Sequence, residues 1–161
     1  MATNIIELPP EMFPISDFSV SMWVKLDAIN IWTSLFYLSF AKGFCSLIPH
    51  AFDGRPSLRF KPNNEDVWYD TGSSTNISTN KWYHVVSTYN SKTGISGLYV
   101  NGELFGSRTD IPFMNGPLRI LLGGDVYQDS FAGNISDFKI FDQALSSTDV
   151  LKEYLTYENK Q

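Results

Sequence analysis

One stretch of this chain, from Lys81 to Gly102, constrains the fold more than any other; it reads KWYHVVSTYNSKTGISGLYVNG. Aromatic and β-branched residues alternate along residues 82–89, which is typical of a β-strand. Turn-forming residues follow at 90–94, and a second apolar run covers 97–100. The stretch is therefore a predicted hairpin. Because both faces of its first strand carry large side chains, we expect it to lie centrally, between two layers of a sandwich.

Short strands and turns fill most of the remaining chain. The clearest strand is the segment Asp17–Lys25, in which apolar and polar residues alternate. Further strands are expected over residues 34–40, 44–48, 57–61, 67–69, 103–107, 118–122 and 134–141, with an irregular proline-containing segment over 5–14 and a polar loop over 71–80. Because no strand–helix–strand alternation appears, the pattern predicts an all-β, two-sheet sandwich of jelly-roll type.

One short helix is expected at the C-terminal end. Ser146 has the side chain of a helix N-cap, and Asp149 stands at the third helical position, as in a capping box. Apolar residues recur at helical spacing over 150–155. The capping residues and the apolar spacing therefore both predict a helix in this part of the sequence.

Composition narrows the class of protein. A length of 161 residues suits one domain over residues 1–161, and 43% hydrophobic residues can form its core. A net charge of −5 without a Lys/Arg cluster argues against a nucleic-acid partner. No stretch is long and apolar enough to predict a membrane span. The single cysteine, Cys45, lies in an apolar run, which favours a buried, inert thiol.

Several segments together resemble one known family. They are DFSVSMWVKL, KWYHVVSTYN, GLYVNGEL, LRILLGG and FAGNISDFKIFDQALSSTDVLKEY, and their order and spacing are similar to those of the laminin-G-like, concanavalin A-like superfamily. The resemblance covers residues 18–154 and implies a concanavalin A-like jelly roll that binds carbohydrates or proteins. Pentraxins and the N-terminal half of the clostridial neurotoxin receptor-binding region look like distant relatives.

The departures from the family pattern are also informative. The glycosidase branch carries paired acids on one strand as E-x-D-x-x-E, whereas Glu65-Asp66 and Asp137 lack that spacing. We therefore expect a protein that is not an enzyme. The chain also starts partway into the segment with which family domains usually begin. This suggests a domain of a larger extracellular or cell-surface protein.

The loop Gly123–Asp129 is a candidate calcium site. Calcium prefers several hard oxygen ligands, and the loop offers Asp125 and Asp129, with Gln128 as a third ligand. The resemblance supports this placement, because a similar loop of pentraxins binds calcium beside the ligand. The earlier Asp-Asn pair of pentraxins is missing here, so a solvated turn is the alternative.

Aromatic residues in or beside loops are candidates for sugar binding. A sugar site combines an aromatic platform with amide and carboxylate partners at its rim. The predicted ligand-binding residues are Trp32, Trp68, Tyr69, Asp70, Tyr127 and Gln128. Binding and packing are both open for Trp32 and Trp68, while Trp23 and Trp82 are expected in the core.

These observations predict a non-catalytic module that binds a glycan or glycoprotein through loops at one edge of the sandwich, with calcium as an assisting ion. The alternative is a protein–protein adhesion or structural module of a larger secreted protein or toxin, without sugar affinity. The sequence does not separate the two, because both would use the same loops.

Overall fold

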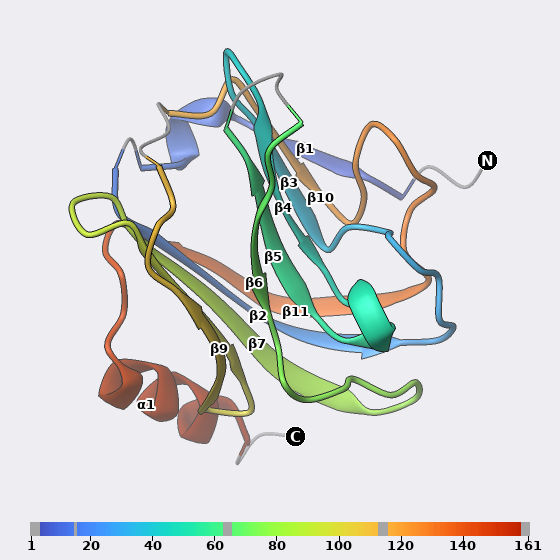
Figure 1. Ribbon diagram of the computed structural model, residues 1–161. Helices are drawn as coiled ribbons and strands as arrows, with labels where there is room; N and C mark the ends of the chain where they lie inside the picture. Colours follow the sequence, from blue (N-terminus) through green and yellow to red (C-terminus); the bar gives the residue numbers. More distant parts are fainter. Residues whose placement is uncertain (1–3, 15, 63–65, 113–115, 159–161) are drawn as a thin grey trace.

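The computed structural model describes residues 4–14, 16–62, 66–112 and 116–158, which form two antiparallel β-sheets and one α-helix (Figure 1). The elements are β1 (Ile6–Leu8), η1 (Pro10–Met12), β2 (Phe18–Leu26), β3 (Phe36–Ser39), β4 (Phe44–Ile48), η2 (Phe52–Gly54), β5 (Ser57–Lys61), β6 (Tyr69–Gly72), β7 (Trp82–Asn90), β8 (Ile95–Val100), β9 (Glu103–Arg108), β10 (Arg119–Leu122), β11 (Gly133–Phe141) and α1 (Ser147–Glu158). The predicted all-β sandwich with one C-terminal helix is confirmed.

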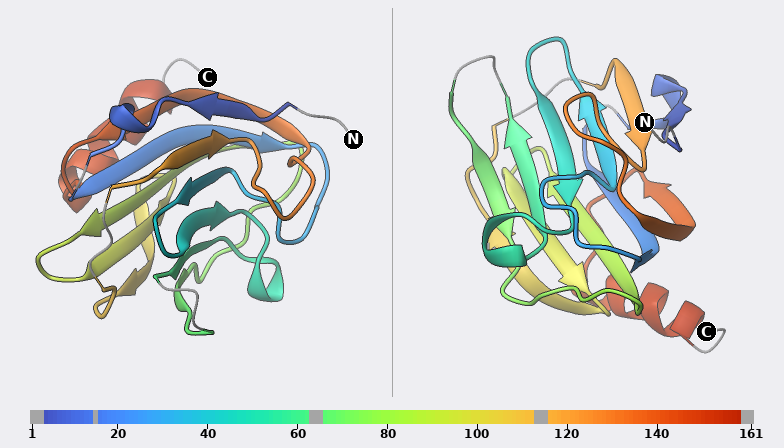
Figure 2. Two further views of the ribbon diagram at one scale, coloured as in Figure 1. Left: turned by 90° about the horizontal axis from the view of Figure 1, so that it is seen from above. Right: turned by 90° about the vertical axis from the view of Figure 1, so that its right-hand side faces the viewer.

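Each of the two sheets contains strands from both the N-terminal and the C-terminal part of the chain. The six-stranded sheet has the order β1-β10-β3-β4-β5-β6, and the five-stranded sheet has the order β11-β2-β7-β8-β9. Thus β1 pairs with β10, and β2 pairs with β11, both antiparallel. Figure 2 shows the two sheets as separate layers.

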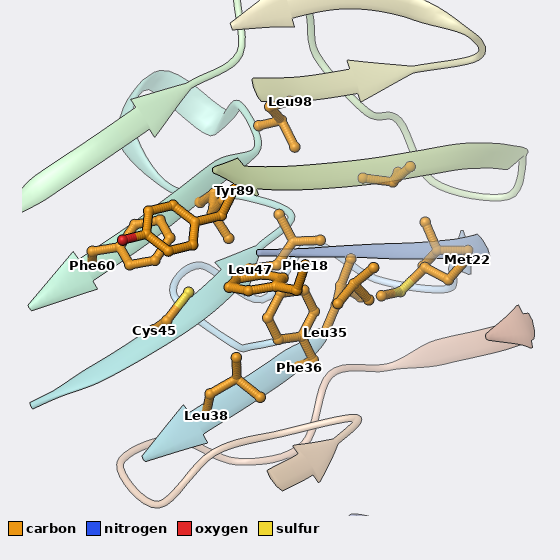
Figure 3. Packing of buried hydrophobic residues seen from close by; sticks show 14 of the residues in the cluster. Phe18, Met22, Leu35, Phe36, Leu38, Cys45, Leu47, Phe60, Tyr89 and Leu98 are labelled. Atoms are coloured by element: carbon orange, nitrogen blue, oxygen red, sulfur yellow. The ribbon is translucent and has the colours of Figure 1, made fainter. Parts of the chain in front are cut away.

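The core lies between the two sheets and follows from the period-two alternation of their strands. On β2 the side chains of Val20, Met22 and Val24 are completely buried. The six-stranded sheet contributes the facing layer, including Leu47 and Phe60 (Figure 3). Complete burial of one such side chain stabilises the fold by about 1.5–3 kcal/mol. The sandwich therefore needs no disulfide.

Cys45 lies in this core with no exposed surface. Burial raises the pKa of its thiol well above the ordinary range, so the reactive thiolate is disfavoured. The prediction of a buried thiol is confirmed.

The hairpin of β7 and β8 is central, as predicted, but the second layer that covers it is a helix. One face of β7 and β8 packs into the core, and the outer face packs under α1. That outer cluster includes Val86, Tyr99 and Val150. Trp23 is buried on the same side, with its ring centroid 5.8 Å from that of Tyr154. The helix is therefore what allows large side chains on both faces of the five-stranded sheet.

Four local expectations need correction. Residues 5–14 are not wholly irregular, because β1 forms an edge strand there, followed by η1. The strand expected over 67–69 begins only at Tyr69, and the polar loop expected from residue 71 starts inside β6. Trp82, expected in the core, is the half-buried first residue of β7. Glu65, named above as an acid without the glycosidase spacing, lies outside the described residues.

Ser146 caps α1 as the sequence predicts. Its hydroxyl oxygen accepts a hydrogen bond from the Asp149 backbone N–H at 3.2 Å, and its carbonyl accepts one from the Val150 N–H at 2.9 Å. We expect Ser146→Ala to lower the free energy of unfolding by about 1 kcal/mol, because the side-chain cap is lost. Chemical denaturation measures this, with Thr148→Ala at an exposed position of the first turn as the control. Equal stability of the two variants would contradict a capping role.

Candidate functional site

The candidate site lies on the outer face of the six-stranded sheet. Because Cys45 and Leu47 point into the core, their neighbours Phe44, Ser46 and Ile48 point to the opposite face. The same alternation turns Tyr37 on β3 and Arg59 on β5 outward. Figure 1 shows η2 and the loop after β10 on this side of the sheet.

A pocket of about 190 Å³ opens on this face. It is lined by residues of β3, β4, β5 and three connecting segments: Trp32, Tyr37, Phe44, Ser46, Ile48, Arg59, Trp68, Asp125, Tyr127 and Gln128. Four of the six predicted ligand-binding residues come together here, namely Trp32, Trp68, Tyr127 and Gln128. Asp125, a predicted calcium ligand, also lines the pocket. The prediction of an edge site built by loops differs from this arrangement, in which loops frame a sheet face.

Aromatic rings form a continuous wall around the pocket. The ring centroid of Phe44 lies 5.6 Å from that of Trp68 and 5.4 Å from that of Tyr127. The ring centroid of Tyr37 lies 5.3 Å from that of Phe44 and 6.1 Å from that of Tyr127. Tyr127 is 65% exposed, so its ring is open to a ligand. Such rings offer flat apolar faces of the kind against which sugar rings pack.

Burial raises the pKa of the Tyr37 hydroxyl, with Tyr127 as the next contribution. The phenol therefore stays protonated at physiological pH and keeps one O–H donor for hydrogen bonding. A second polar group of the pocket, the Gln128 amide, is exposed.

Arg59 occupies the centre of the aromatic wall. Its guanidinium carbon lies 4.1 Å from the ring centroid of Trp68 and 5.0 Å from that of Trp32. The same group pairs with Asp70, at 2.6 Å from Nε to Oδ1 and 3.3 Å from Nη2 to Oδ2. Asp70, predicted as a ligand-binding residue, thus holds Arg59 rather than lining the pocket. Sequence reasoning missed Arg59, although its alternation with the core residues Leu58 and Phe60 marks an outward position.

Tyr69 lies on the other side of the sheet. Adjacent residues of β6 point to opposite faces, so Asp70 points outward while Tyr69 packs against the core cluster. The guanidinium carbon of Arg108 lies 5.0 Å from the ring centroid of Tyr69. The structure therefore does not bring Tyr69 to the pocket.

Asp125 orders the loop that follows β10. Its Oδ1 accepts hydrogen bonds from the backbone N–H groups of Tyr127 at 2.7 Å and Gln128 at 2.8 Å. Its Oδ2 accepts one from the hydroxyl of Ser34. Asp125 as a whole is only 8% exposed, so these bonds compensate the burial of its charge. Through them Asp125 fixes two residues of the pocket.

This bonding also bears on calcium. Three of about four lone-pair sites of the Asp125 carboxylate are used inside the loop. Within the described ranges, no three His, Cys, Asp or Glu side chains come together in a way that could hold a metal ion. The donor set therefore does not fit a calcium site without rearrangement, and the assignment of Asp125 and Asp129 stays a prediction.

We expect Asp125→Asn to lower the free energy of unfolding by about 1–2 kcal/mol, with or without calcium, because charge-assisted hydrogen bonds are lost. Thermal melts in chelator and in millimolar calcium measure this, with Asp129→Asn at an exposed loop position as the control. If calcium binds the native loop, it raises the wild-type melting temperature, and Asp129→Asn reduces that rise.

Two further hollows are larger than this pocket. One of about 710 Å³ lies near β11 and the residues after β10, and another of about 330 Å³ lies between η2 and the end of β6. Neither has several aromatic rings around one polar group, which distinguishes the pocket around Arg59. The residues Gly72, Ser73 and Ser74 of the predicted polar loop line the second of these hollows rather than the pocket itself.

The chain has clear relatives in sequence pattern and in structure. Residues 1–151 match the family model Laminin_G_3, described as the concanavalin A-like lectin/glucanases superfamily. Among solved structures, the chain is similar to domain 4 of AbnA, a GH43 extracellular arabinanase from Geobacillus stearothermophilus, in complex with arabinotriose. The identity is 27% and the TM-score 0.82, covering 92% of this chain and 71% of that one.

Two further solved structures share the fold. The CBM40 of the Ruminococcus gnavus IT-sialidase, bound to α2,3-sialyllactose, has a TM-score of 0.71 at 15% identity, covering 88% of this chain and 84% of that one. A heptameric SAP-like pentraxin from Limulus polyphemus has a TM-score of 0.68 at 19% identity, covering 88% and 71%. No curated protein matches the chain in sequence.

Proposed function

Because the chain belongs to the concanavalin A-like lectin/glucanase superfamily, we propose that it is a non-catalytic module that binds carbohydrate in the pocket around Arg59. The observation that carries this proposal is the grouping of Trp32, Phe44, Trp68 and Tyr127 around a few polar side chains. Aromatic surface with a small number of placed polar groups is the usual composition of a small-ligand site.

The size and charge of the pocket favour a neutral sugar. Its volume of about 190 Å³ is below the roughly 300 Å³ at which pockets for drug-sized ligands begin, so it suits one sugar residue. The central cation, Arg59, is already paired with Asp70. A carboxylated sugar would have to compete with this ion pair, whereas a neutral sugar would not.

Arabinose-containing oligosaccharides are the sugar class that we select for testing. The solved structure at 27% identity is a domain in complex with arabinotriose. In this chain, the exposed ring of Tyr127 and the half-buried ring of Trp68 would pack against the sugar, while Gln128 and Ser46 would exchange hydrogen bonds with its hydroxyl groups.

A binding role without catalysis is supported by how the acids near the pocket are used. Glycoside hydrolysis needs two carboxyl groups facing the scissile bond. Asp125 is hydrogen-bonded within its loop, and Asp70 is paired with Arg59. Among the described residues that line the pocket, Asp125 is the one acid. We therefore expect no release of reducing sugar from arabinan.

The extracellular setting of the arabinanase suggests that this module also works outside the cell, as part of a larger protein. No helix in the described part of the chain is long and apolar enough to cross a membrane.

Protein–protein adhesion is the alternative function. The glycan-binding experiment described next, run beside a protein pull-down, separates it from carbohydrate binding.

A glycan array that includes arabinan fragments, followed by titration calorimetry with arabinotriose, tests the proposed function. We expect saturable binding of arabinotriose by the wild-type protein. If no glycan binds while a pull-down recovers a specific protein partner, the adhesion alternative replaces the carbohydrate proposal.

A further inference from the structure

A second hollow adjoins the pocket around Arg59. Its volume is about 330 Å³, and its lining is more polar than that of the pocket: Phe52, Asp53, Arg55, Pro56, Ser57, Gly72, Ser73 and Ser74. Of these residues only Phe52 carries an aromatic ring. This hollow lies where η2 meets the start of β5 and the end of β6.

The strand register places the two hollows side by side. Ser57 of the second hollow is directly opposite Ile48 of the pocket, since the two residues pair across β4 and β5. Cβ atoms of directly opposed residues lie about 4.5–5.5 Å apart. Ser57 also lies two positions before Arg59 on the same strand, so both side chains point to the outer face.

Phe52 forms the boundary between the two hollows. Its ring centroid lies 5.0 Å from that of Trp32 and 5.2 Å from the guanidinium carbon of Arg59, both of which line the pocket. The same side chain lines the second hollow and is 53% exposed. A ligand that leaves the pocket past Phe52 therefore enters the second hollow.

Ser57 provides the polar group that points to a ligand. Its side chain is 2% exposed, and its hydroxyl makes no hydrogen bond with any described residue. Buried hydroxyl groups normally have a partner, because leaving them unpaired is unfavourable. This one lines a hollow large enough for a ligand and offers one donor and two acceptor positions.

We propose that this hollow is a second sugar subsite, so that the protein prefers an oligosaccharide to a single sugar residue. The inference rests on the proposed function of the pocket around Arg59. One sugar residue would occupy the aromatic pocket, and the next would place a hydroxyl group on Ser57 while its ring passes Phe52.

Gly72 allows the second subsite to be closed without disturbing the first. It lines the second hollow, and a Cβ atom built there meets no atom within 4 Å. A glutamine side chain at this position would therefore extend into the hollow. Gly72→Ala is the matched control, because it changes the backbone in the same way but leaves most of the hollow open.

The experiment is titration calorimetry with methyl α-L-arabinofuranoside and with arabinotriose. For the wild-type protein and Gly72→Ala, we expect arabinotriose to bind about tenfold more tightly than the single residue, which corresponds to about 1.4 kcal/mol. In Gly72→Gln this preference disappears, whereas the affinity for the single residue is unchanged.

Ser57→Ala gives an independent test. We expect a three- to tenfold loss of affinity for arabinotriose, no change for the single residue, and a melting temperature no lower than that of the wild type. The last expectation follows because the hydroxyl has no partner to lose.

The possible results separate the two proposals. If neither sugar binds the wild-type protein, the proposed function is overturned in its arabinan form. If both sugars bind with equal affinity, or if Gly72→Gln keeps the preference for arabinotriose, the second subsite is overturned while the pocket stands.

Discussion

Replacing Trp68 by alanine is expected to abolish measurable sugar binding while leaving the stability of the protein nearly unchanged. Trp68 precedes β6 and is half-buried. The guanidinium carbon of Arg59 and the Nζ atom of Lys61 lie 4.1 and 4.9 Å from its ring centroid. Its Nε1–H donates a hydrogen bond to the Asp66 carboxylate at 3.2 Å. Loss of a central aromatic contact in a binding site costs about 2–4 kcal/mol, or about 30- to 1,000-fold in Kd.

Calorimetry with arabinotriose measures the loss of affinity, and a thermal melt measures stability. Val67→Ala is the matched control, since Val67 is the exposed neighbour of Trp68 and does not line the pocket. A drop of about 3–5 kcal/mol in the free energy of unfolding for Trp68→Ala would instead identify a core residue. That outcome would remove Trp68 from the site.

A second large effect is expected from pH, through His84. This residue of β7 is 1% exposed and lies under α1, with its ring 5.2 Å from Trp23 and 6.0 Å from Tyr154. Its Nε2 is 2.9 Å from the Ser21 hydroxyl, while its Nδ1 has no hydrogen-bond partner among the described residues. Burial lowers the pKa of His84 from 6.5 to about 4; nearby Lys139 adds to this shift, and Asp137 opposes it.

The direction of the pH effect follows from proton linkage. Between about pH 4 and 6.5 the unfolded chain binds a proton on His84 that the native protein does not, so the free energy of unfolding falls as pH falls. The contribution is complete above about pH 6.5, and we expect a loss of about 2 kcal/mol at pH 5 and about 3 kcal/mol at pH 4.

Urea denaturation at pH 7.5, 6 and 5 measures this slope, and His84→Gln should flatten it. Among the described residues, three carboxylates have lowered pKa values in the native state: Glu7 beside Arg119, Asp17 beside Ser91 and Asp110 beside Arg108. Their contributions are lost only as pH falls below about 4.5, outside the window used for His84. An unchanged slope in His84→Gln would contradict the assignment.

The fold could be predicted from the sequence because the patterns that indicate its strands and its helix are local and agree with each other. The alternation along 17–25 predicts a strand with one face in the core, and β2 buries Val20, Met22 and Val24. Likewise the Ser146 cap needs only residues three positions apart. The sequence could not predict which element covers the outer face of β7. A strand with large side chains on both faces packs equally well under a sheet or under a helix.

The candidate site could be predicted from the sequence only in part, for a related reason. Trp32, Trp68, Tyr127 and Gln128 stand out as loop residues, and the structure brings them together. Tyr37 and Phe44 lie within strands that carry apolar residues on both faces, so the sequence does not say which face is outside, whereas Arg59 could have been placed outward from its core neighbours Leu58 and Phe60. Tyr69 and Asp70 show the same limit: one step along β6 moves a side chain from the core to the outer face.

The pairing of strands from opposite ends of the chain has a consequence for the kinetics of folding. Strands β3 to β6 and the β7–β8–β9 meander pair with their neighbours in sequence, whereas β10 returns to β3 and β11 returns to β2. Contacts between distant segments form slowly, because a long loop must close before they stabilise the chain. Trp32 precedes β3 and Trp68 lies between β5 and β6, so both belong to the locally paired part, but Tyr127 and Gln128 follow β10. We therefore expect the binding pocket to be completed late in refolding, after most of the six-stranded sheet has formed.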